Sequence, residues 1–259
     1  MNVRHAHAVF VHGSSVVHRM PAVVKLATLG VVVVAVVATP REQVWALVGE
    51  AAIVAAVAIV ARLGPATFAR RMVVAAPFLV FALALPFFGS APRVSLHGVS
   101  LSVEGVWAAW SIFAKGLVCL AAAILMTATT TVPEIIEGLG RLRVPALMVG
   151  IASFMVRYLD VLAEESNRMR TAMAARGYAP RWLWQAAPTA GAASVLFVRS
   201  YERGERTYDA MVARGYAGEM PHLHGGAAGG RDWALGIAVA GAMTLVALAA
   251  VIAGWGAVA

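Results

Sequence analysis

The feature that most constrains this chain is a series of long stretches that carry no charged residue. One stretch fills the gap between Arg71 and Arg93, and another runs from Asp232 to the last residue, Ala259. About 20 consecutive apolar residues cross the hydrocarbon core of a bilayer, so both stretches are long enough to span a membrane. Charged residues make up only 13% of the chain, and its mean hydropathy is +0.78. Ordinary soluble proteins hold about twice that share of charge, which excludes a disordered chain and a water-soluble enzyme.

These stretches predict an all-α integral membrane protein with about five transmembrane helices. The expected spans cover about residues 26–38, 44–61, 72–92, 106–127 and 233–259. Two further apolar stretches, Val144–Val156 and Trp182–Val198, run on into charged, helix-like sequence. We interpret each as a long helix that is apolar at one end and amphipathic at the other. The count rises to seven spans if both of these helices cross the membrane.

Arginine placement predicts how the chain is oriented in the membrane. The connection after the second span holds Arg62, Arg70 and Arg71, whereas the Gly89–Glu104 connection holds Arg93 alone. Cytosolic loops carry the excess of basic residues, so the first connection is expected inside and the second outside. The N-terminus and the region after the fourth span are then cytosolic. The net charge of +8 flanks membrane spans, and we therefore expect no nucleic-acid partner.

The same pattern divides the chain into four segments. We expect an N-terminal bundle of four spans over residues 1–128 and a cytosolic, arginine-rich module of amphipathic helices over 129–220. A flexible linker, 221–232, contains the run Gly-Gly-Ala-Ala-Gly-Gly. Residues 233–259 form the C-terminal transmembrane helix.

An internal repeat lies within the cytosolic module. The octapeptide Ala172–Ala179 recurs 38 residues later as Ala210–Ala217, and the two copies differ at one position. An acidic residue followed four positions later by a basic one precedes each copy, in the orientation that stabilises a helix. These pairs are Glu164 with Arg168 and Glu202 with Arg206. The repeat predicts two helices with matching ends.

Both copies of the repeat contain an Arg-Gly dipeptide, and these two residues have clear roles at the end of a helix. Gly177 and Gly215 follow helical stretches and suit the left-handed position that terminates a helix. Arg176 and Arg214 fall in the last turn, where a cation complements the helix dipole. Either copy alone would be typical of an ordinary capped helix. Two similar helix ends instead suggest a partner with two similar pockets.

The paired motifs resemble a known family. Ala175-Arg176-Gly177 and Ala213-Arg214-Gly215 look like the two signatures of the transmembrane T component of energy-coupling-factor (ECF) transporters. Other elements are similar in order: His18-Arg19 before Lys25-Leu26, then Val132-Pro133-Glu134, Leu139, Leu142 and Val144-Pro145, and finally Ser200–Arg206. The last of these looks most like the cobalt-type, CbiQ-like branch of the family.

The resemblance implies a subunit without a catalytic site. Such a T component joins two cytosolic ATP-binding-cassette ATPases to a substrate-binding membrane subunit, with a small accessory membrane subunit in some complexes. Arg176 and Arg214 would dock in grooves of the two ATPases, which hold the ATP and magnesium. The complex would lie in a bacterial inner membrane and supply cobalt for cobalamin synthesis. Nickel or a vitamin is the alternative substrate.

Other classes of function remain open at this point. The chain has no Gly-Lys dipeptide, and hence no Walker A loop, and no His-Glu-x-x-His zinc motif. We therefore expect no enzyme and no cofactor in this chain. Glu50 and Lys115 lie inside apolar runs, where a charge is expensive and often functional; they could pair, line a helix interface or reach the headgroups. A membrane-embedded enzyme would need these two residues and Asp160 in one cavity. A structural anchor would recruit cytosolic proteins without transport.

Two His-x-His pairs could bind metal in principle. They are His5 with His7 and His222 with His224. Imidazole suits cobalt and nickel. Neither pair has a nearby carboxylate to complete a site, so we expect solvated histidines and assign no metal ligand.

Overall fold

The computed structural model describes residues 13–88, 93–96, 99–179, 182–218 and 228–256. The chain forms two compact units. The first, here called the bundle, comprises residues 9–138 and 225–259. The second, here called the crossed-helix unit, comprises residues 1–8 and 139–224.

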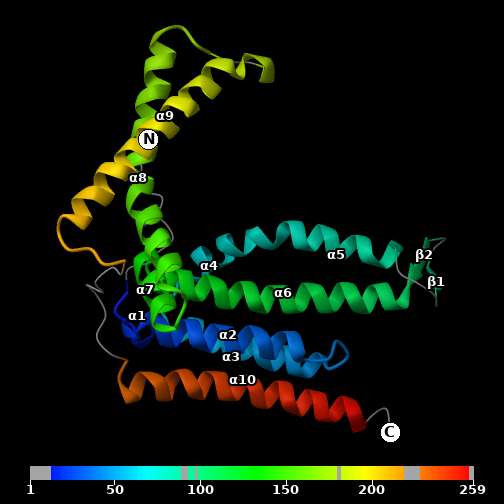
Figure 1. Ribbon diagram of the computed structural model, residues 1–259. Helices are drawn as coiled ribbons and strands as arrows, with labels where there is room; N and C mark the ends of the chain where they lie inside the picture. Colours follow the sequence, from blue (N-terminus) through cyan, green and yellow to red (C-terminus); the bar gives the residue numbers. More distant parts are fainter. Residues whose placement is uncertain (1–12, 89–92, 97–98, 180–181, 219–227, 257–259) are drawn as a thin grey trace. The chain divides into compact units, whose positions relative to one another are not determined.

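Long apolar helices make up the bundle. Its elements are α1 (Val16–Arg19), α2 (Ala22–Ala38), α3 (Val44–Val60), α4 (Pro65–Met72), the 3₁₀ turn η1 (Val73–Ala75), α5 (Ala76–Phe88), α6 (Val103–Thr129) and α10 (Gly230–Gly256). α10 packs along α2, and α5 packs along α6. α2 also contacts α6, and α3 contacts both α6 and α10, so the long helices run side by side (Figure 1).

The bundle core consists mainly of valine and alanine. Val36 and Met243 are fully buried, and they belong to a cluster that also contains Val54, Val118 and Ala247. Small and β-branched side chains let helices approach closely, and this packing is what joins helices inside a membrane. The outward faces of the same helices remain apolar and exposed, as lipid contact requires.

The helices confirm an all-α membrane protein. Among the described residues, four helices are long and apolar enough to cross a membrane: Pro65–Phe87, α6, α10 and α8 of the crossed-helix unit. α2 and α3 are shorter apolar helices of 17 residues each. At 1.5 Å per residue, 17 residues rise about 26 Å, near the lower limit for a span. The proline at position 40 follows the end of α2 closely.

Two details differ from the expectations. Arg70 and Arg71 belong to helix α4, which starts at Pro65, so the third apolar helix begins earlier than the charge pattern indicates. The connection expected outside the membrane contains an antiparallel hairpin of β1 (Arg93–Leu96) and β2 (Val99–Ser102). Four-residue strands are too short to give a clear alternating pattern, so the hairpin leaves no signal in the sequence.

Two long helices form the crossed-helix unit. They are α8 (Ala146–Ala175) and α9 (Ala187–Val212), and the 3₁₀ turn η2 (Leu183–Ala186) precedes α9. The helices run in opposite directions and cross (Figure 1), with the Tyr158 hydroxyl 3.1 Å from the Thr207 hydroxyl. Neither helix has a buried residue among those described. α7 (Val132–Arg141) contains the boundary between the two units.

Candidate functional site

Both copies of the repeat form the same kind of helix end. After α8, the amide of Gly177 donates to the carbonyl of Ala174 (3.0 Å), and that of Tyr178 donates to Met173 (3.1 Å). After α9, Gly215 donates to Val212 (2.9 Å) and Tyr216 donates to Met211 (3.0 Å). This pair of bonds defines the Schellman motif. The repeat therefore specifies two superposable backbone structures.

A left-handed glycine makes each of these ends possible. Gly177 has φ +81° and Gly215 has φ +85°. Nothing lies within 4 Å of the position that a Cβ would occupy at either residue. The glycine is thus required by the backbone conformation rather than by lack of space.

The arginine before each glycine is free to meet a partner. Arg176 and Arg214 are both exposed, whereas the tyrosines that follow, Tyr178 and Tyr216, are half-buried. The Tyr178 hydroxyl bonds to the carbonyl of Gln185, which holds the turn after α8 in place. Each motif therefore presents a guanidinium on a rigid helix end.

The antiparallel crossing places the two motifs at opposite ends of the helix pair. From Tyr158 to Arg176, α8 rises about 27 Å, and from Thr207 to Arg214, α9 rises about 10 Å in the other direction. The two arginines are therefore separated by up to roughly 35 Å. One small ligand cannot bridge them, so the geometry suits two binding partners or two copies of one partner.

Ion pairs lie along both helices of the crossed-helix unit, and the one between Arg199 and Glu165 joins α9 to α8. The pairs expected from the repeat are present, with Arg168 3.8 Å from Glu164 and Arg206 3.9 Å from Glu202. Glu165 also accepts bonds from Arg168 (2.7 Å) and Arg199 (2.6 Å). These two guanidinium groups lower the pKa of the Glu165 carboxyl. Sequence reasoning missed Glu165, because its partner on α9 lies 34 residues away and no local pattern links them.

A groove between α8 and α9 reaches the second motif. Its volume is about 570 Å³, and its lining residues include Ile151, Phe154 and Met155 of α8 and Met211 and Tyr216 at the end of α9. Most of the lining is apolar. The groove gives the crossed-helix unit an open contact surface beside Arg214's helix end.

Glu50 and Lys115 each bond to a group at the end of α2 and also interact electrostatically with each other. Glu50 is fully buried, and its Oε1 accepts a 2.6 Å bond from the Thr39 hydroxyl. The Lys115 ammonium instead donates to the carbonyl of Val37 at the end of α2 (2.9 Å). Asp160 belongs to α8, in the other unit. The structure therefore does not assemble these residues into a site for an embedded enzyme.

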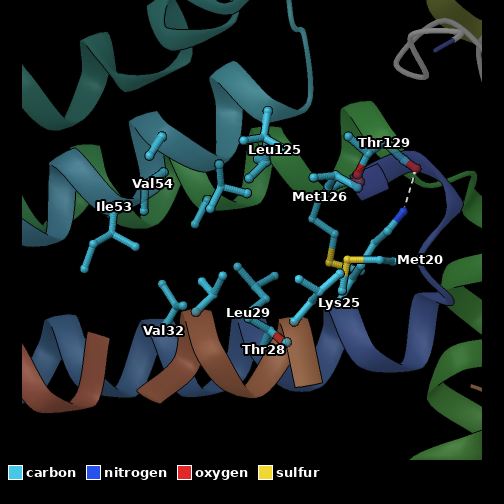
Figure 2. A pocket seen from close by; sticks show the side chains of 18 of the residues that line it. Met20, Lys25, Thr28, Leu29, Val32, Ile53, Val54, Leu125, Met126 and Thr129 are labelled. Carbon is cyan, nitrogen blue, oxygen red and sulfur yellow. Dashed lines mark hydrogen bonds between the residues drawn. The ribbon is translucent and has the colours of Figure 1, made fainter. Parts of the chain in front are cut away.

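The bundle also contains an apolar pocket of about 310 Å³ (Figure 2). Leu29, Val32, Val54 and Met126 line it, and the ammonium of Lys25 points away from its apolar wall. Nearly all of its lining is hydrocarbon, so the pocket offers no groups for acid–base or nucleophilic chemistry.

Metal binding finds no support in the part of the chain that the structure describes. Those residues contain no group of three or more His, Cys, Asp or Glu side chains arranged to hold an ion. His5, His7, His222 and His224 lie outside the described residues.

The described residues define a multi-pass helical membrane protein with two similar helix ends, each of which exposes an arginine. Comparison with known proteins narrows this class. The family model for the cobalt transport protein CbiQ matches residues 13–223, and the chain belongs to this family.

Curated relatives agree with this assignment. The chain is 31% identical to the cobalt transport protein CbiQ of Rhodobacter capsulatus over 129 residues, 49% of this chain and 52% of that protein. It is 28% identical to an uncharacterized protein of Methanocaldococcus jannaschii over 127 residues, 49% of this chain and 44% of that protein. The chain thus spans about half the length of these two relatives. A longer match joins it to the energy-coupling factor transporter transmembrane protein EcfT of Bacillus selenitireducens, with 29% identity over 227 residues, 81% of this chain and 82% of that protein.

Proposed function

We propose that this chain is the energy-coupling T subunit of an ECF-type importer that takes up cobalt for cobalamin synthesis. The observation that carries the proposal is the pair of matching helix ends on α8 and α9. Each end presents one exposed arginine, and the crossing sets the two arginines far apart. This is the arrangement that a subunit needs to engage two similar ATPases at once.

Each arginine supplies the docking chemistry. A planar guanidinium carries five donors and can bond carboxylates or carbonyls in a groove with several hydrogen bonds. Ala175 and Ala213, the small residues that precede the arginines, let a groove wall approach the helix end. In this proposal the ATPases bind ATP and magnesium, and this chain holds no cofactor and catalyses no reaction.

The substrate is proposed from the relatives. The family and the relative from Rhodobacter capsulatus carry the name cobalt transport protein, which favours cobalt over nickel or a vitamin. A separate substrate-binding membrane subunit, with or without a small accessory subunit, would hold the metal.

Reconstitution of the complex tests the proposal. The chain would be co-purified with its ATPases and substrate-binding subunit and placed in liposomes loaded with a metal-sensitive dye. We expect ATP-dependent accumulation of Co²⁺ that exceeds Ni²⁺ at equal concentration. Uptake of nickel or a vitamin alone would correct the substrate, and a complex that assembles without any transport would favour the structural anchor.

The proposed orientation places the N-terminus and the crossed-helix unit in the cytosol. Arginine asymmetry between the connections supports it, and labelling of single cysteines in a Cys119-free background tests it. Ser95→Cys, in β1, should react with an impermeant maleimide in intact cells, and Thr67→Cys, in α4, should react only after permeabilisation. The reverse pattern would invert the topology.

A further inference from the structure

A buried lysine closes the end of α6. The Lys25 ammonium donates to the carbonyl of Thr129 (2.8 Å; Figure 2). It also donates to the hydroxyl of Thr130 (3.0 Å). Lys25 is 8% exposed, and the two threonines are 1% and 2% exposed. The last carbonyls of a helix lack partners within the helix and carry its negative partial charge. A lysine from α2 therefore satisfies this end of α6 in both hydrogen bonding and charge.

The same ammonium also reaches a third element. It lies 3.4 Å from the carbonyl of His18, within α1. A lysine side chain has three N–H donors, and here they serve α1, the end of α6 and the residue after it. Lys25 thus ties α2 to two other elements at one point.

The next helix starts at the same place with a cap of its own. The amide of Thr131 donates to Glu134 Oε2 (2.9 Å), the side-chain contact of a Thr-x-x-Glu capping box. The Glu134 carboxylate also acts electrostatically on the Lys25 ammonium. The end of α6 and the start of α7 are therefore held by opposite charges, with Thr130 between them.

A close contact then holds α7 against α2. A Cβ on Gly138 would lie 2.8 Å from Leu26 Cδ1 and 3.2 Å from the carbonyl carbon of Ala22. Ile136, on the same helix, is buried. The first part of α7 therefore packs directly on the start of α2, at a distance that any larger residue would increase.

The joint, defined here as Lys25 together with the end of α6 and the start of α7, lies next to the boundary between the two units. The boundary between the bundle and the crossed-helix unit falls directly after Gly138, inside α7, which ends at Arg141, and a short turn then leads into α8. A helix that crosses this boundary is a semi-rigid connection and can transmit displacement.

We infer that Lys25 is a positioning residue that locks the α6–α7 junction to α2, so that movement of the crossed-helix unit is passed into the bundle. The inference rests on the proposed function, because it assumes that ATPases drive that movement. An apolar residue could fill the same space without the cost of a buried charge. The lysine adds what an apolar residue cannot, a fixed set of directed bonds between α1, α2 and the junction.

Substitution of residues in the joint tests whether they affect uptake per ATP hydrolysed without affecting retention of the ATPases. Lys25→Met keeps the length of the side chain and removes its donors, and Thr130→Val removes one acceptor. Thr127→Val is the matched control, because its exposed hydroxyl bonds only to carbonyls of its own helix. Three quantities would be measured in proteoliposomes: the amount of ATPase retained, the rate of ATP hydrolysis, and metal uptake per ATP hydrolysed.

We expect Lys25→Met to retain its ATPases and to lower uptake per ATP by roughly tenfold or more, the range of a lost buried bond to a charge. Thr130→Val should have a smaller effect, and the double variant should be no worse than Lys25→Met. Unchanged uptake per ATP in Lys25→Met would overturn the inference. So would a fall in uptake that only matches a loss of assembled complex, since Lys25 would then be a stabilising residue and no more.

A second variant keeps the test informative if Lys25→Met fails to fold. Gly138→Ala adds a Cβ against Leu26 and Ala22 of α2 and removes no hydrogen-bonding group from the α6–α7 junction. We expect it to reduce uptake per ATP, whereas Gly116→Ala, where nothing lies within 4 Å of the added Cβ, should not. Equal coupling in both glycine variants would contradict the inference. Failure of the wild-type complex to transport would instead refute the proposed function.

Discussion

The bundle and the crossed-helix unit bury their side chains in opposite ways. In the bundle, α2, α3 and α6 each contribute several buried residues, and Met243 and Val36 are fully enclosed. In the crossed-helix unit, α8 and α9 have no buried residue among those described. Polar contacts join the two helices between Tyr158 and Thr207 and between Glu165 and Arg199. One region is held by its own core, and the other is not.

This difference indicates that the apolar surface of α8 and α9 is covered by a partner or by lipid and not by the chain itself. Large apolar side chains stay exposed on both helices of the crossed-helix unit, including Leu147 and Phe197, each 72% exposed. Contiguous exposed apolar surface in a helical protein marks contact with a partner or with lipid. The unit is therefore shaped for association, in agreement with the proposed role, whereas the bundle carries its stability within itself.

Charge reversal at the repeated motifs has the largest expected effect. Arg176→Glu with Arg214→Glu should release both ATPases, because loss of one partner from a buried charge contact costs on the order of 2–5 kcal/mol. That is a loss of roughly 30-fold or more in affinity at each end. Either substitution alone should leave the complex assembled through the other helix but uncoupled. Arg→Lys should be intermediate, since a point charge cannot reproduce the planar fork.

Co-purification and ATP-driven uptake measure this effect. Arg170→Glu, an exposed charge reversal on α8 outside the motif, is the control and should retain its ATPases. A double variant that keeps its ATPases and transports at the wild-type rate would reduce both arginines to ordinary helix caps.

The next effect tests whether the bundle depends on its buried polar contact. Glu50 accepts one bond from the Thr39 hydroxyl, and its Oε2 has no hydrogen-bond partner among the described residues. Thr39→Val should leave both oxygens of the Glu50 carboxyl without a hydrogen bond. The expected cost in free energy of unfolding is about 1–3 kcal/mol. Adding Glu50→Leu should recover most of this loss, because both polar groups are then removed together.

Thermal unfolding in detergent provides the measurement. We expect Thr39→Val to lower the midpoint by several degrees, at roughly 2–4 °C per kcal/mol for a chain of this size. Thr244→Val is the control, since that exposed hydroxyl bonds only within its own helix. A double variant less stable than Thr39→Val would show that Glu50 has further partners.

Alanine at the left-handed glycines should act locally. Gly177→Ala and Gly215→Ala place a Cβ in the left-handed region, at a cost of about 1–2 kcal/mol each. Hydrogen exchange at the amides of the helix end should speed up, and ATPase retention should fall less than in the arginine variants. Gly191→Ala, inside α9 with open space around it, should instead stabilise its helix by about 0.5–1 kcal/mol. Slower exchange in the first two variants would contradict the observed caps.

The smallest effect is a pH dependence confined to the crossed-helix unit. Bonds from Arg168 and Arg199 lower the pKa of Glu165. A carboxyl with a lowered folded pKa stabilises fully above its unfolded pKa, about 4.3, and loses this contribution as the pH falls through the lower folded value. The α8–α9 contact should therefore loosen only below about pH 4.3. Spin labels at Asn167→Cys and Val195→Cys, in a Cys119-free background, would report broader distances there. Arg199→Gln should raise the pH at which this occurs, and an unchanged profile would exclude Glu165 as the cause.

The features that depend on residues close together in the chain could be predicted from the sequence. The absence of charge over about 20 residues predicts a span wherever it occurs, because burial in lipid forbids most charged side chains. The ends of α8 and α9 were equally predictable, because an Arg-Gly dipeptide after a helical stretch needs only its own last turn to form the cap. The spacing of Glu164 and Arg168 likewise predicts a contact that one helix turn creates.

Contacts between distant parts of the chain were decided by the tertiary structure alone. The Lys25 ammonium meets a carbonyl 104 residues away, and Glu165 meets an arginine 34 residues away on another helix. In a sequence, Lys25 is a basic residue at the start of a span, and any of several helix ends could take its charge. The direct packing of α6 on α2 brings the end of α6 to it, and Gly138 permits the close approach of α7 to the same part of α2. Helical periodicity reports which residues share a face, but it does not report which face meets which, and that choice depends on the shapes of both surfaces.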